Sequence, residues 1–419
     1  MRIGHLDLLG LGTALLAVSF GLAVAAEPLP LKYVDQRLQL PGREVVIQLP
    51  AGSQLELLAD NLEGPRLLTF AENGDLFIGS KSGRVYRLPA PYTAPQVLIS
   101  TKGYPHNVAL RQNEILIAQK DGLYHAPYQL GQARIAPDKL RLLAELPGGG
   151  GHSSRTVAIG PDKRVYLSLG ISGNCSDEYL SEGYPFSDRR GGILVLNETG
   201  PQAIWQTFAS GLRNPVGFAW HPQTGELYAS NNGPDHQGYD LPPEYFSKVP
   251  AGSFHGMPWF QYDGKRIQPD DCIKRPPPHP IDEVIPPVAT FPARSAPMGV
   301  AFVPEGAMHK TLAHDAIVAL RGSWGTQPSG GFIGDPATRR EPKLVVVRFH
   351  NGEAQRVDDL VTGFQLHDGE RWARPVGVAV GPDGALYFTS DSGVEGLFRL
   401  RFPMDESEST RGDQRLSGE

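Results

Sequence analysis

Cysteine is scarce in this chain: only Cys175 and Cys272 occur among its 419 residues. The absence of a CxxC motif excludes thioredoxin-type chemistry, and without CxxCH the chain carries no c-type haem of its own. Both cysteines lie in loop-like stretches, so they could form one disulfide or remain two free thiols. A basic surplus is also missing, because 45 acidic residues against 39 basic ones give a net charge of −6. That balance argues against nucleic-acid binding, which needs clustered basic residues.

The chain has too few apolar residues for a polytopic membrane protein and too many for a disordered one, with 40% hydrophobic and 20% charged. One apolar run, Leu8 to Ala25, ends in the A-x-A pattern of a signal-peptide cleavage site. We therefore expect residues 1–25 to be a signal peptide and the product to be exported, either periplasmic or secreted. An uncleaved anchor is the alternative; after cleavage we expect no stable membrane span. The acid-rich stretch 404–419 predicts a disordered tail.

Long amphipathic helices are scarce, and a repeated hairpin pattern takes their place. Each copy has a small residue or proline, an apolar strand, a turn rich in Gly, Asn or Asp, and a second apolar strand. The six copies begin at Gly64, Tyr104, His152, Arg213, Ala296 and Arg374. Units of this kind bury their faces only by stacking, and radial stacking gives a β-propeller. We predict an all-β, six-bladed β-propeller over residues 26–403. The spacing of the copies places long inter-blade loops on one face, after the third, fourth and fifth repeats.

Aligning the repeats brings polar residues to one mouth of the central channel. The alignment on Ala158, Ala219, Ala301 and Ala379 matches His152 with Arg213 and Asn214 with Arg374; it also matches Asn231 with Arg321 and Gln119. The residues expected at this mouth are His152, Arg213, Asn214, Asn231, Asn232, Arg321 and Arg374, with His106 and Asn107 one turn further in. Three arginines together favour a polyanionic small ligand, and a histidine beside them can act as a general base.

Structural roles are the alternative for these side chains. His152 follows four glycines and could cap a flexible loop. Arg213 and Arg374 could pair with loop acids such as Asp235 or Asp391 and hold blades together.

Five stretches resemble the soluble pyrroloquinoline-quinone (PQQ) sugar dehydrogenases of the glucose/sorbosone dehydrogenase family. They are GGHSSRTVAIGPD, GLRNPVGFAWHP, NNGPDHQGYDLPPEYFSKVPAGSFHGMPW, ALRGSW and RPVGVAVGPDGALYFTSDSG. The resemblance implies a six-bladed propeller with PQQ over the channel and Ca²⁺ bound beside it. It also implies oxidation of an aldose or a related sugar aldehyde or polyol, with hydride passing to PQQ. Electrons would leave to an external acceptor, a cytochrome or a quinone.

The resemblance also implies roles for individual residues. His152 would be the catalytic base, and Arg213 would hold both the cofactor and the developing oxyanion. The other cofactor-binding positions are Asn214, Asn232, Arg321, Arg374 and His106. The carbonyls of Gly233 and Pro234 would bind the calcium shared with PQQ, and Asp240 and Glu244 fall near a second calcium site of some relatives. Where many relatives have two close cysteines this chain has one, which makes Cys272 the candidate partner of Cys175.

Two other functions fit parts of the pattern. A calcium-dependent lactonase on the same fold would need carboxylates and amides at the channel centre, and Glu63, Asn107 and Asn214 could supply some. A non-catalytic propeller that binds carbohydrate or protein is the second alternative. The arginine ring argues against the lactonase, because a lactone has no carboxylate to bind.

Overall fold

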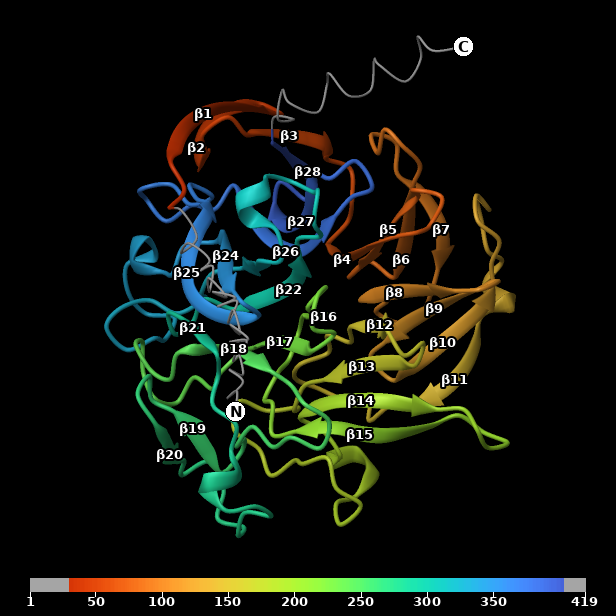
Figure 1. Cartoon of the computed structure of the whole chain (residues 1–419), viewed down its shortest axis with the longest axis vertical. Coiled ribbons are helices and arrows are strands. Elements are labelled where there is room, and N and C mark those ends of the chain that lie inside the picture. Colours follow the sequence, from red (N-terminus) through yellow and green to blue (C-terminus); the bar gives the residue numbers. More distant parts are fainter. Residues whose placement is uncertain (1–29, 403–419) are drawn as a thin grey trace, which may run out of the picture.

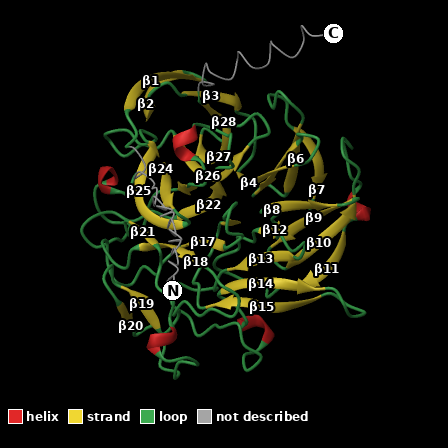
Figure 2. Ribbon diagram, viewed as in Figure 1, coloured by secondary structure: helices red, strands yellow, loops and turns green. Residues whose placement is uncertain are grey.

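The computed structural model describes residues 30–402, and almost all of its regular structure is β-strand. The predicted signal peptide (1–25) and acidic tail (404–419) lie outside the described residues. Within the described range every helix is a single 3₁₀ turn, and none could cross a membrane (Figure 2). These turns are η1 (Pro137–Lys139), η2 (Phe186–Asp188), η3 (Ile281–Glu283), η4 (Lys310–Leu312) and η5 (Pro336–Thr338). The all-β prediction is confirmed.

Six four-stranded antiparallel sheets form a ring around a central axis (Figure 1), which confirms the six-bladed propeller. Blade one is β4 (Pro65–Phe70), β5 (Leu76–Ser80), β6 (Arg84–Leu88) and β7 (Gln96–Ser100). Blade two is β8 (Asn107–Arg111), β9 (Glu114–Gln119), β10 (Gly122–Pro127) and β11 (Arg141–Glu145). Blade three is β12 (Val157–Ile159), β13 (Val165–Leu169), β14 (Gly192–Asn197) and β15 (Ile204–Ser210).

The remaining three blades follow the same order from the axis outward. Blade four is β16 (Phe218–Trp220), β17 (Leu227–Asn231), β18 (Glu244–Lys248) and β21 (Ala289–Phe291). Blade five is β22 (Pro297–Phe302), β23 (Ala316–Leu320), β24 (Lys343–His350) and β25 (Glu353–Val361). Blade six is β26 (Ala373–Val380), β27 (Leu386–Gly393), β28 (Gly396–Arg401) and, from the N-terminal side of the chain, β3 (Gln54–Ala59).

Strand β3 closes the ring, because it pairs with β28 and so joins the two ends of the propeller in one sheet. Before it, β1 (Tyr33–Leu40) and β2 (Arg43–Pro50) form a hairpin that lies beside the outer strand of blade five. A short hairpin, β19 (Phe260–Tyr262) and β20 (Ile267–Pro269), projects from blade four. The closure protects the sheet edges at the point where the chain begins and ends.

Glycines let the innermost strands approach one another at the axis. Gly217, Gly299 and Gly377 occupy equivalent positions in blades four, five and six, and a Cβ added to any of them would lie within 2.8 Å of backbone on the next blade. The second strands of the blades are also tightly packed: β5, β9, β13 and β23 are buried along their whole length or nearly so. Uninterrupted apolar strands of this kind suit sheets that pack on both faces.

The sequence predicts extra chain after the third, fourth and fifth repeats. In blades three and five the long connection follows the second strand, over residues 170–191 and 321–342. Because both leave the second strand of a blade, they emerge at the mouth where the first strands begin. In blade four the connection after the second strand, 232–243, is shorter, and most of the extra chain lies between β18 and β21, over residues 249–288, which include the β19–β20 hairpin.

Candidate active site

The pairing register fixes which residues of the six blades are equivalent. The first two strands pair Thr69 with Phe77 in blade one, and Ala219 with Tyr228 in blade four. In each blade the aligned first-strand residue has one pairing partner on the second strand. The residue four positions after that partner is equivalent in all six blades, and these residues are Lys81, Lys120, Gly170, Asn232, Arg321 and Asp391. Arg321 is therefore equivalent to Asn232, and the predicted match of Arg321 with Asn231 is wrong by one residue. The error arises because no marker residue shows where β23 ends.

His152 is held in one tautomer beside the channel mouth. Its Nδ1 lies 2.7 Å from the carbonyl oxygen of Ile171, which only accepts, so Nδ1 carries the proton and Nε2 keeps its lone pair. Burial, followed by the charge of Arg213, lowers the pKa of His152 to about 4. The imidazole is consequently neutral at neutral pH and able to accept a proton at Nε2.

Asn214 and Arg213 lie next to this histidine. A Cβ built on Gly170 would meet both the Asn214 Oδ1 and the His152 Cβ, so the two side chains share one small space. Arg213 is buried, and its guanidinium donates to the carbonyls of Asn174 (2.7 Å) and Asn232 (3.2 Å). Burial lowers its pKa to about 10, which leaves it charged. The structure brings these three predicted residues together, with Arg213 clamped between two loops.

Asn231 and Asn232 hold the residues that precede or begin the first strands of blades four and five. The Asn231 Oδ1 accepts from the backbone N–H of Asn214 (2.9 Å), and the Asn232 side chain donates to the carbonyl of Pro297 (2.7 Å). Asn232 thus links blade four to blade five rather than standing free for a ligand.

Asp391 joins three cations from blades one and five. Its carboxylate, with no side-chain exposure, lies 2.6 Å from Arg66 Nη1, 2.7 Å from Lys81 Nζ and 2.8 Å from Arg321 Nε. Burial alone would raise the pKa of Asp391, but Arg66, Arg321 and Lys81 outweigh burial and hold it well below its ordinary value. The alternative names Arg213 and Arg374 as partners for such a loop acid; Asp391 instead forms its ion pairs with Arg66, Lys81 and Arg321.

Three further arginines extend this positive region. Arg374 donates to the carbonyls of Arg321 (2.9 Å) and Gly322 (2.8 Å), and Arg371 donates to Gln365 Oε1 (2.8 Å). Burial, then repulsion from Arg321 and Arg371, lowers the pKa of Arg374 to about 9. The charge of Arg339 also contributes to lowering the pKa of Arg371 and of Arg374. We define the cationic cluster as Arg66, Lys81, Arg321, Arg339, Arg371 and Arg374; in the part of the chain that the structure describes, Asp391 is the carboxylate that ion-pairs with it.

His106 is fully buried and supports the cationic cluster from inside the channel wall. Its Nδ1 lies 2.9 Å from the Tyr104 hydroxyl and 3.4 Å from Arg66 Nε. Burial and then the charge of Arg66 hold its pKa well below the usual value. Arg66 Nη2 reaches Ser154 Oγ (3.4 Å), so the cluster is joined to the His152 loop.

The four residues predicted to bind metal have different surroundings. Glu244 is buried, and its two oxygens accept from the backbone N–H groups of Gly233 (2.5 Å) and Arg294 (2.9 Å). Asp240 has an 80% exposed side chain and pairs with Arg340 (2.7 Å). The Pro234 carbonyl accepts from the Arg294 guanidinium (3.2 Å). The structure therefore does not unite Asp240 with Glu244, and burial raises the pKa of Glu244 to about 7.

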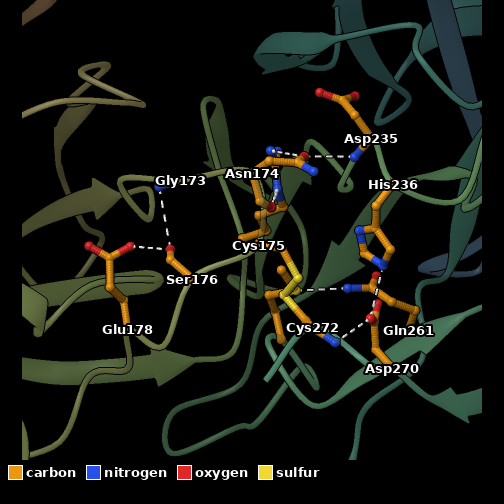
Figure 3. Close-up of a disulfide and its surroundings, with 12 residues drawn as sticks. Gly173, Asn174, Cys175, Ser176, Glu178, Asp235, His236, Gln261, Asp270 and Cys272 are labelled. Carbon is orange, nitrogen blue, oxygen red and sulfur yellow. Dashed lines mark hydrogen bonds and ion pairs between the residues drawn. A yellow bond between two sulfur atoms is a disulfide. The ribbon is translucent and has the colours of Figure 1, made fainter. Parts of the chain in front are cut away.

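A disulfide between Cys175 and Cys272 braces the loop beside Arg213 (Figure 3). It settles the alternative that the sequence leaves open in favour of the bonded pair. The neighbouring Asn174 is the contact point, since its Oδ1 accepts from Arg213 Nη2 (3.0 Å) and from the backbone N–H of Asp235 (2.7 Å). The disulfide thereby positions a residue that holds both Arg213 and the loop after Asn232.

Sequence reasoning missed several residues of this mouth. Lys81 occupies the same repeat position as Arg321, so extending the alignment to all six repeats finds it; the same position in blade six is Asp391, which the sequence analysis names as a partner for an arginine but not as part of the mouth. Arg66 is equivalent to His106 in the next blade. Asn174, Arg294 and Arg339 come from irregular loops, where the repeat offers no signal.

Comparisons with known proteins agree with the propeller. The sequence model of a family described as TrAA12-like matches residues 47–244 and 274–398. An uncharacterized protein of Borreliella burgdorferi is 25% identical over 372 residues, which cover 85% of this chain and 91% of that protein. The calcium structure of the Trichoderma reesei carbohydrate-active enzyme of family AA12 superposes with a TM-score of 0.70 at 18% identity, covering 90% of this chain and 99% of the other. The holo form of the pyranose dehydrogenase PQQ domain from Coprinopsis cinerea gives 0.67 at 20% identity, covering 85% and 97%.

Proposed function

Because the chain belongs to the TrAA12-like family, we propose that it is a sugar oxidoreductase that uses PQQ to oxidise an aldose or a related sugar aldehyde or polyol. The observation that carries the proposal is the neutral His152, with a free Nε2, at the same channel mouth as the cationic cluster. The solved relatives named for a PQQ domain and for carbohydrate-active enzymes share the fold and support the same reading.

The cationic cluster fits a tricarboxylate such as PQQ. Six cations face one paired carboxylate, and Arg371 and Arg374 donate to neutral oxygens instead of acids. Mutual repulsion of the arginines is relieved by an anion, so binding a polycarboxylate restores charge balance at the mouth. Arg321 and Arg374 keep the role expected of them, whereas buried His106 orients Tyr104 and Arg66.

His152 supplies the proton acceptor for the reaction. PQQ, when bound, supplies the acceptor for the hydride from the sugar carbon. His152 Nε2 takes the proton of the sugar hydroxyl, and the bond from Nδ1 to Ile171 keeps the ring in the tautomer that can do so. Burial, and then the charge of the adjacent Arg213, lowers the pKa of His152 and keeps the imidazole neutral before proton transfer.

The calcium part of the sequence prediction finds less support. Of the two predicted carbonyl ligands, that of Pro234 is already bonded to a guanidinium. Asp240 is exposed and ion-paired, and both Glu244 oxygens accept from backbone N–H groups. Among these four predicted residues, within the described part of the chain, the Gly233 carbonyl alone accepts no hydrogen bond. Ca²⁺ takes six to eight oxygen ligands, water included, so these residues do not make up a Ca²⁺ site by themselves.

We extend the proposal to the place and partners of the reaction. The disulfide supports export to an oxidising compartment, periplasmic or extracellular. Two electrons per sugar must leave PQQ, so an external acceptor, a cytochrome or a quinone, is required. The lactonase alternative loses two of its three candidate ligands, because Glu63 pairs with Arg84 at the surface and Asn107 Oδ1 accepts from the Val157 N–H (3.1 Å); Asn214 alone is left.

Single-turnover kinetics test the proposal. The protein incubated with PQQ should show a bound quinone by absorbance, which an aldose reduces. In His152→Ala we expect PQQ binding to remain and the reduction to slow by a factor of about 10²–10⁴, the contribution of a positioned base. His125→Ala serves as the control; His125 lies on β10 and pairs with Glu114 on β9, away from the channel mouth. Unchanged reduction in His152→Ala, or no bound quinone at all, would defeat the proposal.

A further inference from the structure

The Arg294 guanidinium lies inside the loop Pro234–Gly238, which begins at Pro234, one of the two residues whose carbonyls are predicted to bind calcium. Its Nη1 donates to the Pro234 carbonyl (3.2 Å), its Nη2 to the Asp235 carbonyl (2.5 Å) and its Nε to the Gly238 carbonyl (3.1 Å). The Asp235 carboxylate completes the set through an ion pair with Nη1. Only 3% of the Arg294 side chain is exposed. One buried cation is thus surrounded by three carbonyls and a carboxylate.

This set of oxygens is the kind that a hard cation takes in proteins. A calcium ion on the Pro234 carbonyl would lie about 2.3–2.6 Å from that oxygen. Since Nη1 lies 3.2 Å from the same oxygen, the two cations could be at most about 5.8 Å apart. A second guanidinium, that of Arg213, donates to the preceding carbonyl of Asn232. A divalent ion here would therefore face two buried guanidinium groups, with Asp235 and the buried Glu244 as the nearby carboxylates, which at most cancel the two arginines and leave no negative charge for the ion.

The backbone holds Arg294 in this place at some cost. Its φ of +72° lies in the left-handed region, which a residue with a side chain rarely adopts. The backbone N–H of Arg294 donates to Glu244, whose other oxygen accepts from Gly233. Glu244 consequently fixes both the start of the loop and the residue that fills it, which is a structural use for the carboxylate first predicted to bind metal.

We propose that the Arg294 guanidinium is the resident cation of the loop Pro234–Gly238, and that the protein binds its quinone cofactor without calcium at this loop. For the cofactor this inference rests on the proposed function; for the ion it does not. Arg294 orders the loop carbonyls, and the loop in turn holds Asn174 through the Asp235 N–H and so supports Arg213.

Equilibrium dialysis of the apoprotein with radioactive Ca²⁺ tests the cation. We expect no saturable binding by the wild type at millimolar calcium. Arg294→Gly, which removes the cation and suits the positive φ, should gain one site that disappears when Asp235→Asn is added. Arg340→Gln is the matched control, since this arginine pairs with Asp240 beside the same loop, and it should behave as the wild type does. Calcium binding by the wild type that Asp235→Asn abolishes overturns the proposal, and this arm does not depend on whether Arg294→Gly folds.

Quenching of tryptophan fluorescence by PQQ tests the cofactor. The wild-type Kd for PQQ should agree within about twofold between a chelator-containing buffer and one with calcium chloride. A Kd weakened about tenfold or more by the chelator overturns the proposal. Absence of PQQ binding in both buffers defeats the proposed function instead, and the dialysis still decides which cation occupies the loop.

Discussion

Asp391 is the residue whose removal should reveal the charge imbalance of the channel mouth. Asp391→Asn keeps the size of the side chain but leaves Arg66, with a 5% exposed side chain, without its ion pair. Breaking a buried pair by removing one partner costs about 3–5 kcal/mol. Lys81 is half exposed and adds little, at most about 1 kcal/mol. We expect the free energy of unfolding, measured by urea titration at low salt, to fall by about 3–5 kcal/mol.

Two further measurements separate this cause from a general loss of packing. The wild-type ion pairs stabilise the protein only while Asp391 is ionised; because its folded-state pKa is depressed, their contribution is present above about pH 4 and lost at lower pH. The difference between wild type and Asp391→Asn should therefore shrink as the pH falls below about 4. Citrate, a tricarboxylate, should stabilise the variant more than the wild type. Asp240→Asn, which alters an 80% exposed carboxylate 2.7 Å from Arg340, is the control and should cost less than about 1 kcal/mol. A loss below 1 kcal/mol in Asp391→Asn, or no extra effect of citrate, would refute the reasoning.

Three other predictions follow from the described contacts. With the pKa of His152 lowered to about 4, its base form persists at acid pH, so kcat/KM for sugar oxidation should stay level down to about pH 5 and decline through pH 4; a decline centred near 6.5 contradicts the assigned environment. Replacing both cysteines by serine opens a link across 97 residues and should lower the free energy of unfolding by up to roughly 4.7 kcal/mol, and equal stability with and without reductant in the wild type argues against this. Gly217→Ala places a Cβ 2.2 Å from the Met298 carbonyl and should cost about 1–3 kcal/mol in urea unfolding, whereas Gly183→Ala, with its nearest neighbour at 3.7 Å, should be neutral.

The fold could be predicted because the propeller repeats itself in the sequence. Each blade needs an apolar inner strand, a tight turn and a second buried strand, and these demands leave the same pattern six times. The closing strand β3 was not predicted, since an outer strand carries no such signature: in β3 only Leu55 and Ala59 are buried. Its partner β28 is almost 340 residues away in the chain, and no local feature joins the two.

The candidate site could be predicted only where it coincides with the repeat. His152, Arg213 and Asn214 stand at fixed offsets from the first strand, and the structure places them together for that reason. The second-strand offset of Arg321 also contains Asp391, but an acid among arginines was interpreted only as a competing structural partner. A carboxylate that neutralises the charge of the arginines looks the same in the sequence as one that holds their side chains in position, because the two roles differ only in distance and burial.

The loops decide how far a family pattern may be transferred to this chain. Gly233 and Pro234 satisfy the pattern of a calcium loop, yet their neighbour in space is Arg294, 60 residues beyond Pro234. A sequence motif cannot specify a backbone carbonyl ligand, because every residue has a carbonyl oxygen. Whether that oxygen can bind a metal ion depends on which hydrogen-bond donor the fold places next to it. A motif whose ligands are backbone carbonyls therefore predicts the shape of the loop and leaves open which cation fills it. At Pro234 the donor is a guanidinium, and the balance of charge, in which Asp235 and Glu244 at most cancel Arg213 and Arg294, favours the protein's own cation over a metal ion.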